Sequence, residues 1–476
     1  MLDFLERSLG EFRSCFSRER AFRWFVLLVI AFILREDHLG VTSAIRTLVL
    51  DPVYYLNILH FFRSDAYRTE ELRKCWYRIV KNSHLLVREH GRIILIGDGV
   101  KQSKEGNYIP GVKKLHQESE DSSKAEYIFG HLFGAVGILI GNVNQMLCLP
   151  LQMNIQDGLK EAASWEGSGI SGESHVVQMI TKGYEVSKVI GSSLFLLDRY
   201  FLTVPALKKL KELNDSGDKK LVDIVTKAKM NCVAYEKPVL REPGKRGRPR
   251  KKGASVSLRS LFDDRDSFQK TKLFLYGNLK DVEFLSRDLL WGQGLYQELR
   301  FVLVTYDSTQ SILVSTDLTL DPEIIIQLYA RRMKIECCFR EFKQQLGGFG
   351  YHFWTRSVQK LNHYKRREDP DPLACVAEEK DRKKVLRTID AIERFVLLAG
   401  IAMGLIQMML LSDNSPSYIQ RLRYLRTMTE GKLSEATLMY YLRRTFFTGL
   451  ASRPRSFITR FISEAQNPED WADKAS

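Results

Sequence analysis

The chain has 476 residues, of which 44% are hydrophobic and 27% are charged, a balance that excludes a disordered chain and allows two to four domains. Lys and Arg outnumber Asp and Glu by 72 to 57, so the formal net charge is +15. This excess indicates a polyanionic partner, either nucleic acid or an anionic membrane surface. The seven Cys residues show no C-x-x-C spacing, which indicates a reducing compartment and no structural zinc.

The first 88 residues follow a helical pattern, with aromatic residues at the spacing of a buried core. The run WFVLLVIAFIL (24–34) is too short to cross a bilayer. We therefore expect residues 1–88 to form a helical, DNA-binding N-terminal region.

Two apolar strands each lead directly into an aspartate. RIILIG (92–97) predicts a buried strand that ends at Asp98, and SSLFLL (192–197) predicts a second one that ends at Asp198. Sites of α/β proteins are built where strands end, although either aspartate alone would also fit a simple helix or loop cap. The other elements expected here are strands at 127–141, 145–155 and 227–238, and helices at about 174–190 and 203–213.

A basic loop, KPVLREPGKRGRPRKKG (237–253), interrupts this pattern. Arg246 and Arg248 stand in an R-G-R-P sequence that resembles an AT-hook, which lies in a narrow A·T minor groove. A flexible basic linker that contacts phosphates without sequence preference, or a nuclear-localisation signal, would look similar. Beyond the loop, residues 272–291 and 298–317 predict β-strands.

Residues 321–347 predict a long helix, with Asp321 as N-cap, Pro322 in the first turn and Gly347 at the end. Lys334 and Glu341 should point to solvent. A buried stripe is expected from Leu328, Ile335, Phe339, Phe342 and Leu346. A half-buried stripe beside it contains Tyr329, Arg332, Glu336 and Lys343. The adjacent Cys337 and Cys338 are interpreted as packing residues.

The single acid of the half-buried stripe has two interpretations. Glu336 can form an intrahelical salt bridge with Arg340 or Arg332. It can also be the third carboxylate of a site with Asp98 and Asp198. Three converging carboxylates repel one another unless a cation lies between them, and hard divalent ions such as Mg²⁺ prefer carboxylate oxygen.

The order strand–Asp98, strand–Asp198, helix–Glu336 resembles the DDE transposases. Tyr329, Arg332, Glu336 and Lys343 match the Y-x-x-R-x-x-x-E-x-x-x-x-x-x-K signature of bacterial insertion-sequence transposases that cut and paste through a DNA hairpin. The resemblance also covers DGVKQSKEGNYIPGV, the pair Gly130–His131 and FGYHFW, and so spans about residues 40–410.

This resemblance implies an α/β fold with an RNase H-like catalytic core, a mixed sheet flanked by helices, interrupted by a β-rich insertion. Glu336 follows Asp198 by 138 positions (336 − 198), which leaves room for that insertion. The expected regions are a helical N-terminal region (1–88), the first part of the core (89–236), the basic loop and insertion (237–320), the second part of the core with the Glu helix (321–411), and a basic helical C-terminal region (412–476).

The resemblance also implies a function, which is cleavage at insertion-sequence ends and joining to target DNA. Asp98, Asp198 and Glu336 would be catalytic and would bind two Mg²⁺ ions, with Mn²⁺ able to substitute. Tyr329, Arg332 and Lys343 would hold the DNA backbone, and Arg246 and Arg248 would add DNA contacts. The expected partner is double-stranded DNA bound by a homodimer in a synaptic complex, without a membrane, in the bacterial cytoplasm at the nucleoid.

Other functions remain open from the sequence. The chain could be an RNase H-fold nuclease or domesticated relative without strand transfer, a non-catalytic DNA-binding protein of the AT-hook type, or a membrane protein anchored by residues 395–411. That run contains Gln407 and a G-x-x-x-G spacing at Gly400 and Gly404, which favours a closely packed core helix.

Several single residues also have two interpretations. His131 fits a core histidine better than a site residue. Trp291 fits a sheet core as well as a platform for a flipped base. The loop lysines are expected to meet DNA; they are Lys101, Lys104, Lys113 and Lys124.

Overall fold

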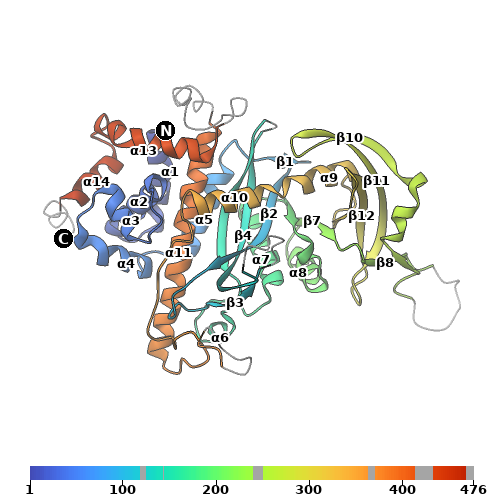
Figure 1. Cartoon of the computed structure of the whole chain (residues 1–476), viewed down its shortest axis with the longest axis horizontal. Coiled ribbons are helices and arrows are strands. Elements are labelled where there is room, and N and C mark those ends of the chain that lie inside the picture. Colours follow the sequence, from blue (N-terminus) through green and yellow to red (C-terminus); the bar gives the residue numbers. More distant parts are fainter. Residues whose placement is uncertain (118–124, 143, 240–249, 363–369, 413–432, 468–476) are drawn as a thin grey trace. The chain divides into compact units, whose positions relative to one another are not determined.

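Figure 1 shows the computed structural model of the chain, which describes all residues except 118–124, 143, 240–249, 363–369, 413–432 and 468–476. The chain is an α/β protein in which mixed strands are flanked by helices. It forms two compact units. Unit 1 contains residues 1–87, 99–175 and 337–476, and unit 2 contains residues 88–98 and 176–336.

Unit 1 is mostly helical. Its helices are α1 (Leu2–Gly10), η1 (Glu11–Cys15), α2 (Glu19–Leu34), α3 (Thr42–Leu48), η2 (Pro52–Tyr54), α4 (Tyr55–Arg63), α5 (Thr69–Lys81), α6 (Lys160–Ala163), α11 (Glu379–Leu410), α13 (Glu435–Ala451) and α14 (Phe457–Gln466). Its strands are β3 (Lys113–His116), β4 (Tyr127–Gly141) and β5 (Met146–Ile155). β4 pairs antiparallel with both β3 and β5, which confirms the predicted strand pair.

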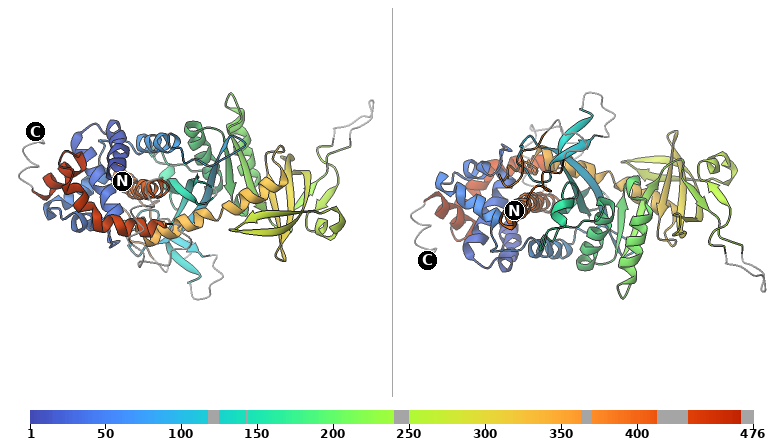
Figure 2. Two further views of the ribbon diagram at one scale, coloured as in Figure 1. Left: turned by 90° about the horizontal axis from the view of Figure 1, so that it is seen from above. Right: turned by 90° about the horizontal axis from the view of Figure 1, so that it is seen from below.

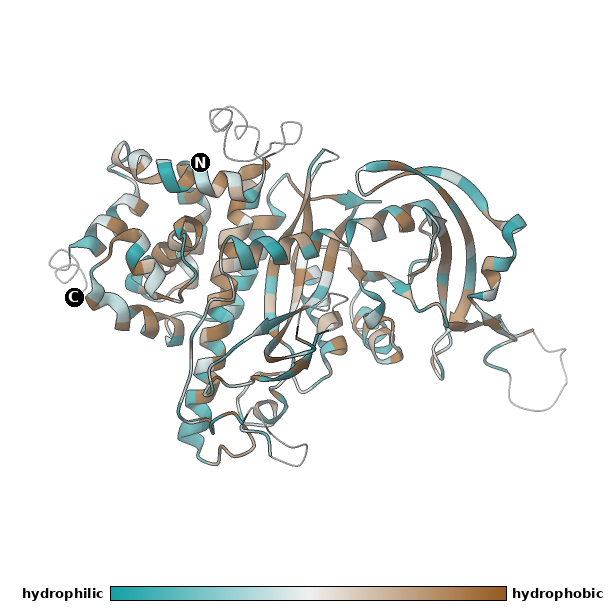
Figure 3. Ribbon diagram, in the orientation of Figure 1, coloured by the Kyte–Doolittle hydropathy of each residue, from teal (hydrophilic) through white to brown (hydrophobic). Residues whose placement is uncertain are grey.

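Helix α11 lies at the centre of unit 1, where it packs against β5, α2, α4, α5 and α13. Figure 3 shows that α11 is hydrophilic at its start and hydrophobic over the rest of its length. The charged composition of about residues 355–390 predicts a linker, and this is wrong for its last part, because α11 already begins at Glu379. The charged first turns are helical since they bury Val385 and Ile389.

The polar interruption of this helix has a partner inside the fold. The buried amide of Gln407 donates from Nε2 to the Cys148 carbonyl at 3.2 Å and to Glu435 Oε1 at 3.2 Å. The predicted core helix is therefore confirmed. No helix in the described part of the chain has the length and apolar character that a membrane crossing needs.

Unit 2 contains most of the strands, in the order β2-β6-β7-β13-β12-β11-β8-β9, with β1 on β2 and β10 on β11. Their bounds are β1 (Arg88–Glu89), β2 (Arg92–Ser103), β6 (Ser193–Leu197), β7 (Val222–Ala228), β8 (Val233–Tyr235), β9 (Ser255–Ser257), β10 (Gln269–Leu275), β11 (Asn278–Trp291), β12 (Gln297–Tyr306) and β13 (Thr309–Ser315). The helices are α7 (His175–Ile190), η3 (Arg199–Phe201), α8 (Val204–Asp215), η4 (Ser260–Asp263), η5 (Arg265–Ser267), α9 (Pro322–Arg331) and α10 (Lys334–Gln344), which continues into unit 1.

Strands β2, β6 and β7 run parallel, and the next strands are antiparallel. Residues 93–97 of β2 and all residues of β6 are buried, so both faces are covered where the two strands pair in parallel. α7 covers one face closely, because a methyl group at Gly183 would come within 2.3 Å of the Phe195 ring. Figures 1 and 2 show β10, β11 and β12 as a curved layer with α9 beside it.

Two strand predictions in unit 2 are wrong. β2 does not end at Asp98 but continues to Ser103. The single strand expected at 227–238 is instead the end of β7, a turn and β8. The turn is closed by a hydrogen bond from the Cys232 N–H to the Lys229 carbonyl, 3.0 Å long. Before the turn β7 pairs with β13, and after it β8 pairs with β11.

Candidate active site

Two parallel strands place the aspartates side by side. In the β2–β6 register, Gly97 is paired with Leu197. The residues that follow this pair are Asp98, on β2, and Asp198, just after β6. Asp198 is the first residue after β6, as predicted, and both side chains are half-buried. The strand register alone therefore brings two carboxylates to one place in unit 2.

The helix that carries Glu336 is interrupted. The sequence predicts one helix over 321–347, but α9 ends at Arg331 and α10 begins at Lys334. Between them the backbone makes tighter bonds, from the Arg332 N–H to the Tyr329 carbonyl (3.0 Å) and from the Glu336 N–H to the Met333 carbonyl (3.1 Å). No Pro or Gly marks this break, so no local pattern in the sequence predicts it.

Other features of this helix prediction have mixed outcomes. The predicted apolar stripe is buried throughout. Asp321 is the N-cap residue, but its side chain accepts no capping hydrogen bond. Lys334 and Glu341 are half-buried rather than directed to solvent. Cys338 is buried as predicted, whereas Cys337 is exposed, so its interpretation as a packing residue is wrong.

The break places the Arg332 guanidinium among the three acids. Its Nη1 lies 2.9 Å from Asp98 Oδ2, and its Nη2 lies 3.0 Å from Glu336 Oε1 and 3.8 Å from Asp198 Oδ1. The Arg332 side chain is 12% exposed, whereas the Glu336 side chain is 45% exposed. The expected salt bridge between Glu336 and Arg332 is present, and it lies where the three carboxylates converge.

The convergence of charges shifts the pKa values of the basic and phenolic groups. Burial alone would lower the pKa of Arg332, but Asp98, Tyr329, Asp198 and Glu336 raise it well above its ordinary value. Burial also raises the pKa of Tyr329, whose hydroxyl donates to Asp198 Oδ1 at 3.5 Å. Both groups therefore keep their protons at neutral pH and remain hydrogen-bond donors.

Sequence reasoning missed two residues of this site. Lys227 lies on β7, and its pKa is lowered by burial and by Arg199, while Asp198 opposes the shift. Since Leu196 is paired with Val225, Lys227 stands at the level of Asp198 on the third parallel strand, a register that could have indicated it. Tyr276, in the turn between β10 and β11, interacts with Tyr329 and Arg332, and burial raises its pKa.

The remaining predicted contacts lie in unit 1 or outside the described residues. Lys343 follows Glu336 by two turns of α10, and its Nζ donates to the Lys101 carbonyl at 3.0 Å. Lys104 Nζ donates to the carbonyls of Phe349 (2.6 Å) and Tyr351 (3.0 Å). Lys113 is paired with Asp157 at 2.5 Å. Lys124, Arg246 and Arg248 lie outside the described residues.

Two residues with open interpretations are part of hydrophobic cores. His131 is fully buried, with Nδ1 2.6 Å from the Tyr351 hydroxyl and Nε2 2.9 Å from the Pro110 carbonyl. The prediction of a core histidine is confirmed. Trp291 packs against the buried cluster of the β-rich part of unit 2 and donates from Nε1 to Cys232 Sγ at 3.1 Å, which agrees with the sheet-core interpretation.

The chemistry of the acid cluster fits a hard divalent cation, because all three side chains present carboxylate oxygen to a positive group. In the part of the chain that the structure describes, no group of three or more His, Cys, Asp or Glu side chains stands arranged as a metal site. The cation at the point of convergence is Arg332. Comparison with models of protein families, with curated proteins and with solved structures gave no match to this chain.

Proposed function

We propose that the chain is a DDE transposase that cleaves phosphodiester bonds at insertion-sequence ends and joins them to target DNA. The observation that carries this proposal is the convergence of Asp98, Asp198 and Glu336 on Arg332. Asp98 lies on β2, Asp198 directly follows the parallel strand β6, and Glu336 stands in the Y-x-x-R-x-x-x-E-x-x-x-x-x-x-K pattern. The three carboxylates carry two more negative charges than Arg332 neutralises, a surplus that a divalent cation would balance.

The same proposal includes an RNase H-like core. The parallel strands β2, β6 and β7 and the antiparallel pair β4–β5 support it, because such a core combines both kinds of pairing. The antiparallel strands β10–β13 lie in the chain between β7 and the helix that carries Glu336. That is the place where the proposed family has its β-rich insertion.

In this proposal Asp98, Asp198 and Glu336 would hold Mg²⁺ or Mn²⁺, as two ions. The bound ions supply activation of the attacking oxygen and stabilisation of the leaving one. Arg332 leaves the carboxylates and donates its two Nη groups to a phosphate, for which its planar fork is suited. Tyr329 keeps its proton and donates a hydrogen bond to the DNA backbone, and Lys343 adds a positive point charge beside that backbone.

The proposed partners follow from the reaction. Two element ends are cut and joined together, so we propose a homodimer that holds two double-stranded ends in a synaptic complex. The net charge of +15 supports a DNA partner. The proposed compartment is the bacterial cytoplasm, at the nucleoid.

The test is cleavage of the native element ends by variants of the three acids. Asp98→Ala, Asp198→Ala and Glu336→Ala should each abolish nicking in Mg²⁺ and retain end binding in a native gel. Glu323→Gln is the matched control, because this exposed acid lies on α9 and forms no ion pair with a described residue. Normal nicking by any one alanine variant removes that residue from the site.

Two further readouts separate the alternatives. Normal nicking by Glu336→Gln would leave Glu336 as a salt-bridge partner only. Cut ends that are never joined to a target plasmid would make the chain a nuclease instead of a transposase.

A further inference from the structure

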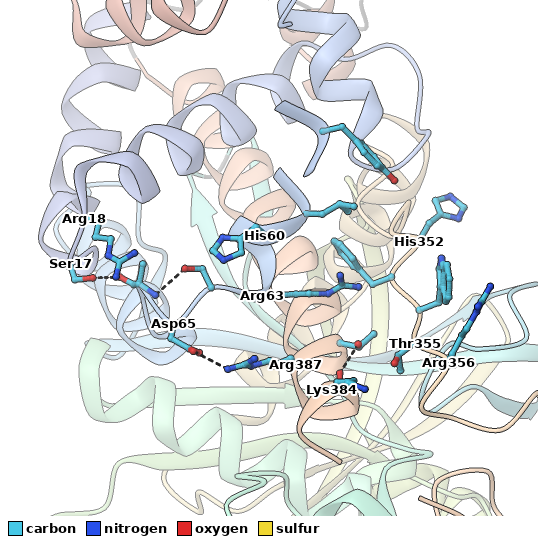
Figure 4. A pocket seen from close by; sticks show the side chains of 17 residues that line it. Ser17, Arg18, His60, Arg63, Asp65, His352, Thr355, Arg356, Lys384 and Arg387 are labelled. Carbon is cyan, nitrogen blue, oxygen red and sulfur yellow. Dashed lines mark hydrogen bonds and ion pairs between the residues drawn. The ribbon is translucent and has the colours of Figure 1, made fainter. Parts of the chain in front are cut away.

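A cationic pocket of about 840 Å³ lies wholly within unit 1 (Figure 4). It is bordered by the start of α2, the end of α4, the segment 352–356 and the first turns of α11. The residues that line it include the basic side chains of Arg18, His60, Arg63, Arg356, Lys384 and Arg387. The acids of the candidate active site are in unit 2, so this pocket is a separate feature.

The positive charge of the pocket is only partly neutralised. Among the described lining residues Asp65 is the one carboxylate, and it is paired with Arg387 at 3.2 Å, an interaction drawn in Figure 4. Lys384 is paired with Asp381 at 2.9 Å. Within the described part of the chain, Arg18, Arg63 and Arg356 form no ion pair with a carboxylate. Three arginines that line one pocket without a carboxylate partner favour a ligand that carries several phosphates.

An exposed indole lines the same pocket, two residues before Arg356 in the chain. Trp354 is 52% exposed, although it lines the pocket. Trp354 also lines a second cavity of about 510 Å³, together with His352, Arg356 and the partly exposed Tyr108. A large aromatic face that is left open between two cavities, next to cations, is the arrangement that binds unpaired bases by stacking.

The neighbours of Trp354 hold this platform in place. Phe353 is buried, with its ring 5.2 Å from the Phe62 ring and 6.1 Å from the Phe395 ring of α11. The Thr355 N–H donates to the Tyr108 carbonyl at 3.0 Å. Because the residues on both sides are fixed, the indole loses little freedom when a base stacks on it.

We propose that this pocket binds single-stranded nucleic acid, with a base stacked on Trp354 and the adjoining phosphates on Arg18, Arg63 and Arg356. The bases of an intact duplex are already stacked and cannot reach the indole, so the pocket should prefer unpaired strands. The inference uses no residue of the acid cluster and goes beyond the cleavage reaction proposed above.

The experiment measures fluorescence anisotropy of a labelled oligothymidylate of about ten nucleotides with the full chain, and of the same length as duplex. Trp354→Ala should weaken single-strand binding about tenfold, and Trp354→Phe should restore most of it. The triple variant Arg18→Ala/Arg63→Ala/Arg356→Ala should reduce the slope of log K against log[salt] by about 2. Arg20→Ala, exposed on α2 outside the pocket, should leave binding unchanged.

Thermal unfolding by circular dichroism checks that each variant is folded. If Trp354→Ala does not fold, Trp354→Phe still tests the proposal. Unchanged single-strand affinity in the folded Trp354 and Arg variants overturns the proposal. Binding of a labelled polyglutamate is measured with the same variants. If they lose polyglutamate binding but keep oligonucleotide binding, the proposal is overturned and the pocket is assigned to an acidic peptide. Nicking of duplex ends tests the cleavage proposal and oligonucleotide binding tests this one, so a failure of the first is distinguishable from a failure of the second.

Discussion

The side chain of Arg332 sets the charge balance of the candidate active site. Three carboxylates lie within 3.8 Å of its guanidinium, and without that cation they would repel one another. In the proposed transposase, Arg332 and a divalent ion would therefore compete for the same oxygens. A DNA phosphate that draws Arg332 away would free the carboxylates, and the arrival of DNA would then be coupled to metal binding.

This competition predicts that Arg332→Ala binds Mn²⁺ at least about tenfold more tightly than the native protein when DNA is absent, because a unit charge a few ångströms away is removed. Nicking of DNA should nevertheless slow by about a hundredfold, since the phosphate loses its positioning group. Electron paramagnetic resonance of free Mn²⁺ gives the affinity, and a gel time course gives the nicking rate.

Arg340→Ala is the matched control, because Arg340 lies on α10 and is paired only with Glu341 within the described residues. It should change neither quantity. An unchanged Mn²⁺ affinity in Arg332→Ala would show that the arginine and the ion do not share a place.

A second buried charge cluster predicts pH dependence of stability. Burial would raise the pKa of Asp317, but hydrogen bonds from the Thr319 hydroxyl and N–H, and the ion pair with Arg92, lower it. Since the folded-state pKa lies below the ordinary value of about 3.9, this carboxylate stabilises the fold above that pH. The contribution is lost as the pH falls through the folded-state pKa.

Asp317→Asn should therefore reduce the free energy of unfolding at pH 7 by about 2 kcal/mol, and by much less at pH near 3. Thermal unfolding at the two pH values measures the difference. Asp281→Asn is the control, because Asp281 is 88% exposed and its pair with Lys272 is also exposed. An equal loss at both pH values would mean that Asp317 acts through packing and not through its charge.

The secondary structure elements differ in how well the sequence predicts them. The buried parallel strands are predictable, because continuous apolar runs such as 193–197 leave no alternative to burial. The helix break at Arg332 is not, since every residue there is a good helix former and the break depends on the acids that the side chain reaches. The two aspartates were found as strand ends, although the extension of β2 to Ser103 depends on pairing that no local pattern records.

The two glycines of α11 give a prediction with its own control. A methyl group at Gly404 would come within 2.3 Å of the Trp76 ring, whereas a methyl group at Gly400 would meet no atom within 4 Å. Gly404→Ala should cost about 1–3 kcal/mol of stability through overpacking. Gly400→Ala should be neutral or stabilising by up to about 1 kcal/mol, since Ala favours helix.

Urea unfolding followed by circular dichroism measures both variants. The G-x-x-x-G spacing alone would predict equal costs at the two positions. Equal losses would mean that α11 does not approach α5 as closely as the structure has it.

In the molecule as a whole, each compact unit is assembled from separated stretches of chain. The stretch 88–98 belongs with 176–336 because β2 pairs in parallel with β6, about a hundred residues away. Hydrophobic pattern describes consecutive segments and contains no information on which distant strands pair. The regions expected from the sequence are therefore continuous stretches of chain, whereas each unit of the structure combines stretches that are distant in sequence.

The net charge of +15 gives the last prediction, which concerns the basic loop outside the described residues. If Arg246 and Arg248 contact DNA, the variant Arg246→Ala/Arg248→Ala should reduce the slope of log K against log[salt] for duplex DNA by about 2. Cleavage at saturating DNA should stay normal, since these residues supply affinity and no chemistry.

The control Arg250→Ala/Lys251→Ala removes the same charge beside the R-G-R-P sequence. Equal effects on A·T-rich and G·C-rich duplexes in both variants would indicate plain phosphate contacts. A loss of A·T preference in the first variant alone would indicate binding in the minor groove, because only a slim extended pair of arginines fits there. An unchanged slope in both would show that the loop does not touch DNA, and the excess charge would then act through the described surfaces.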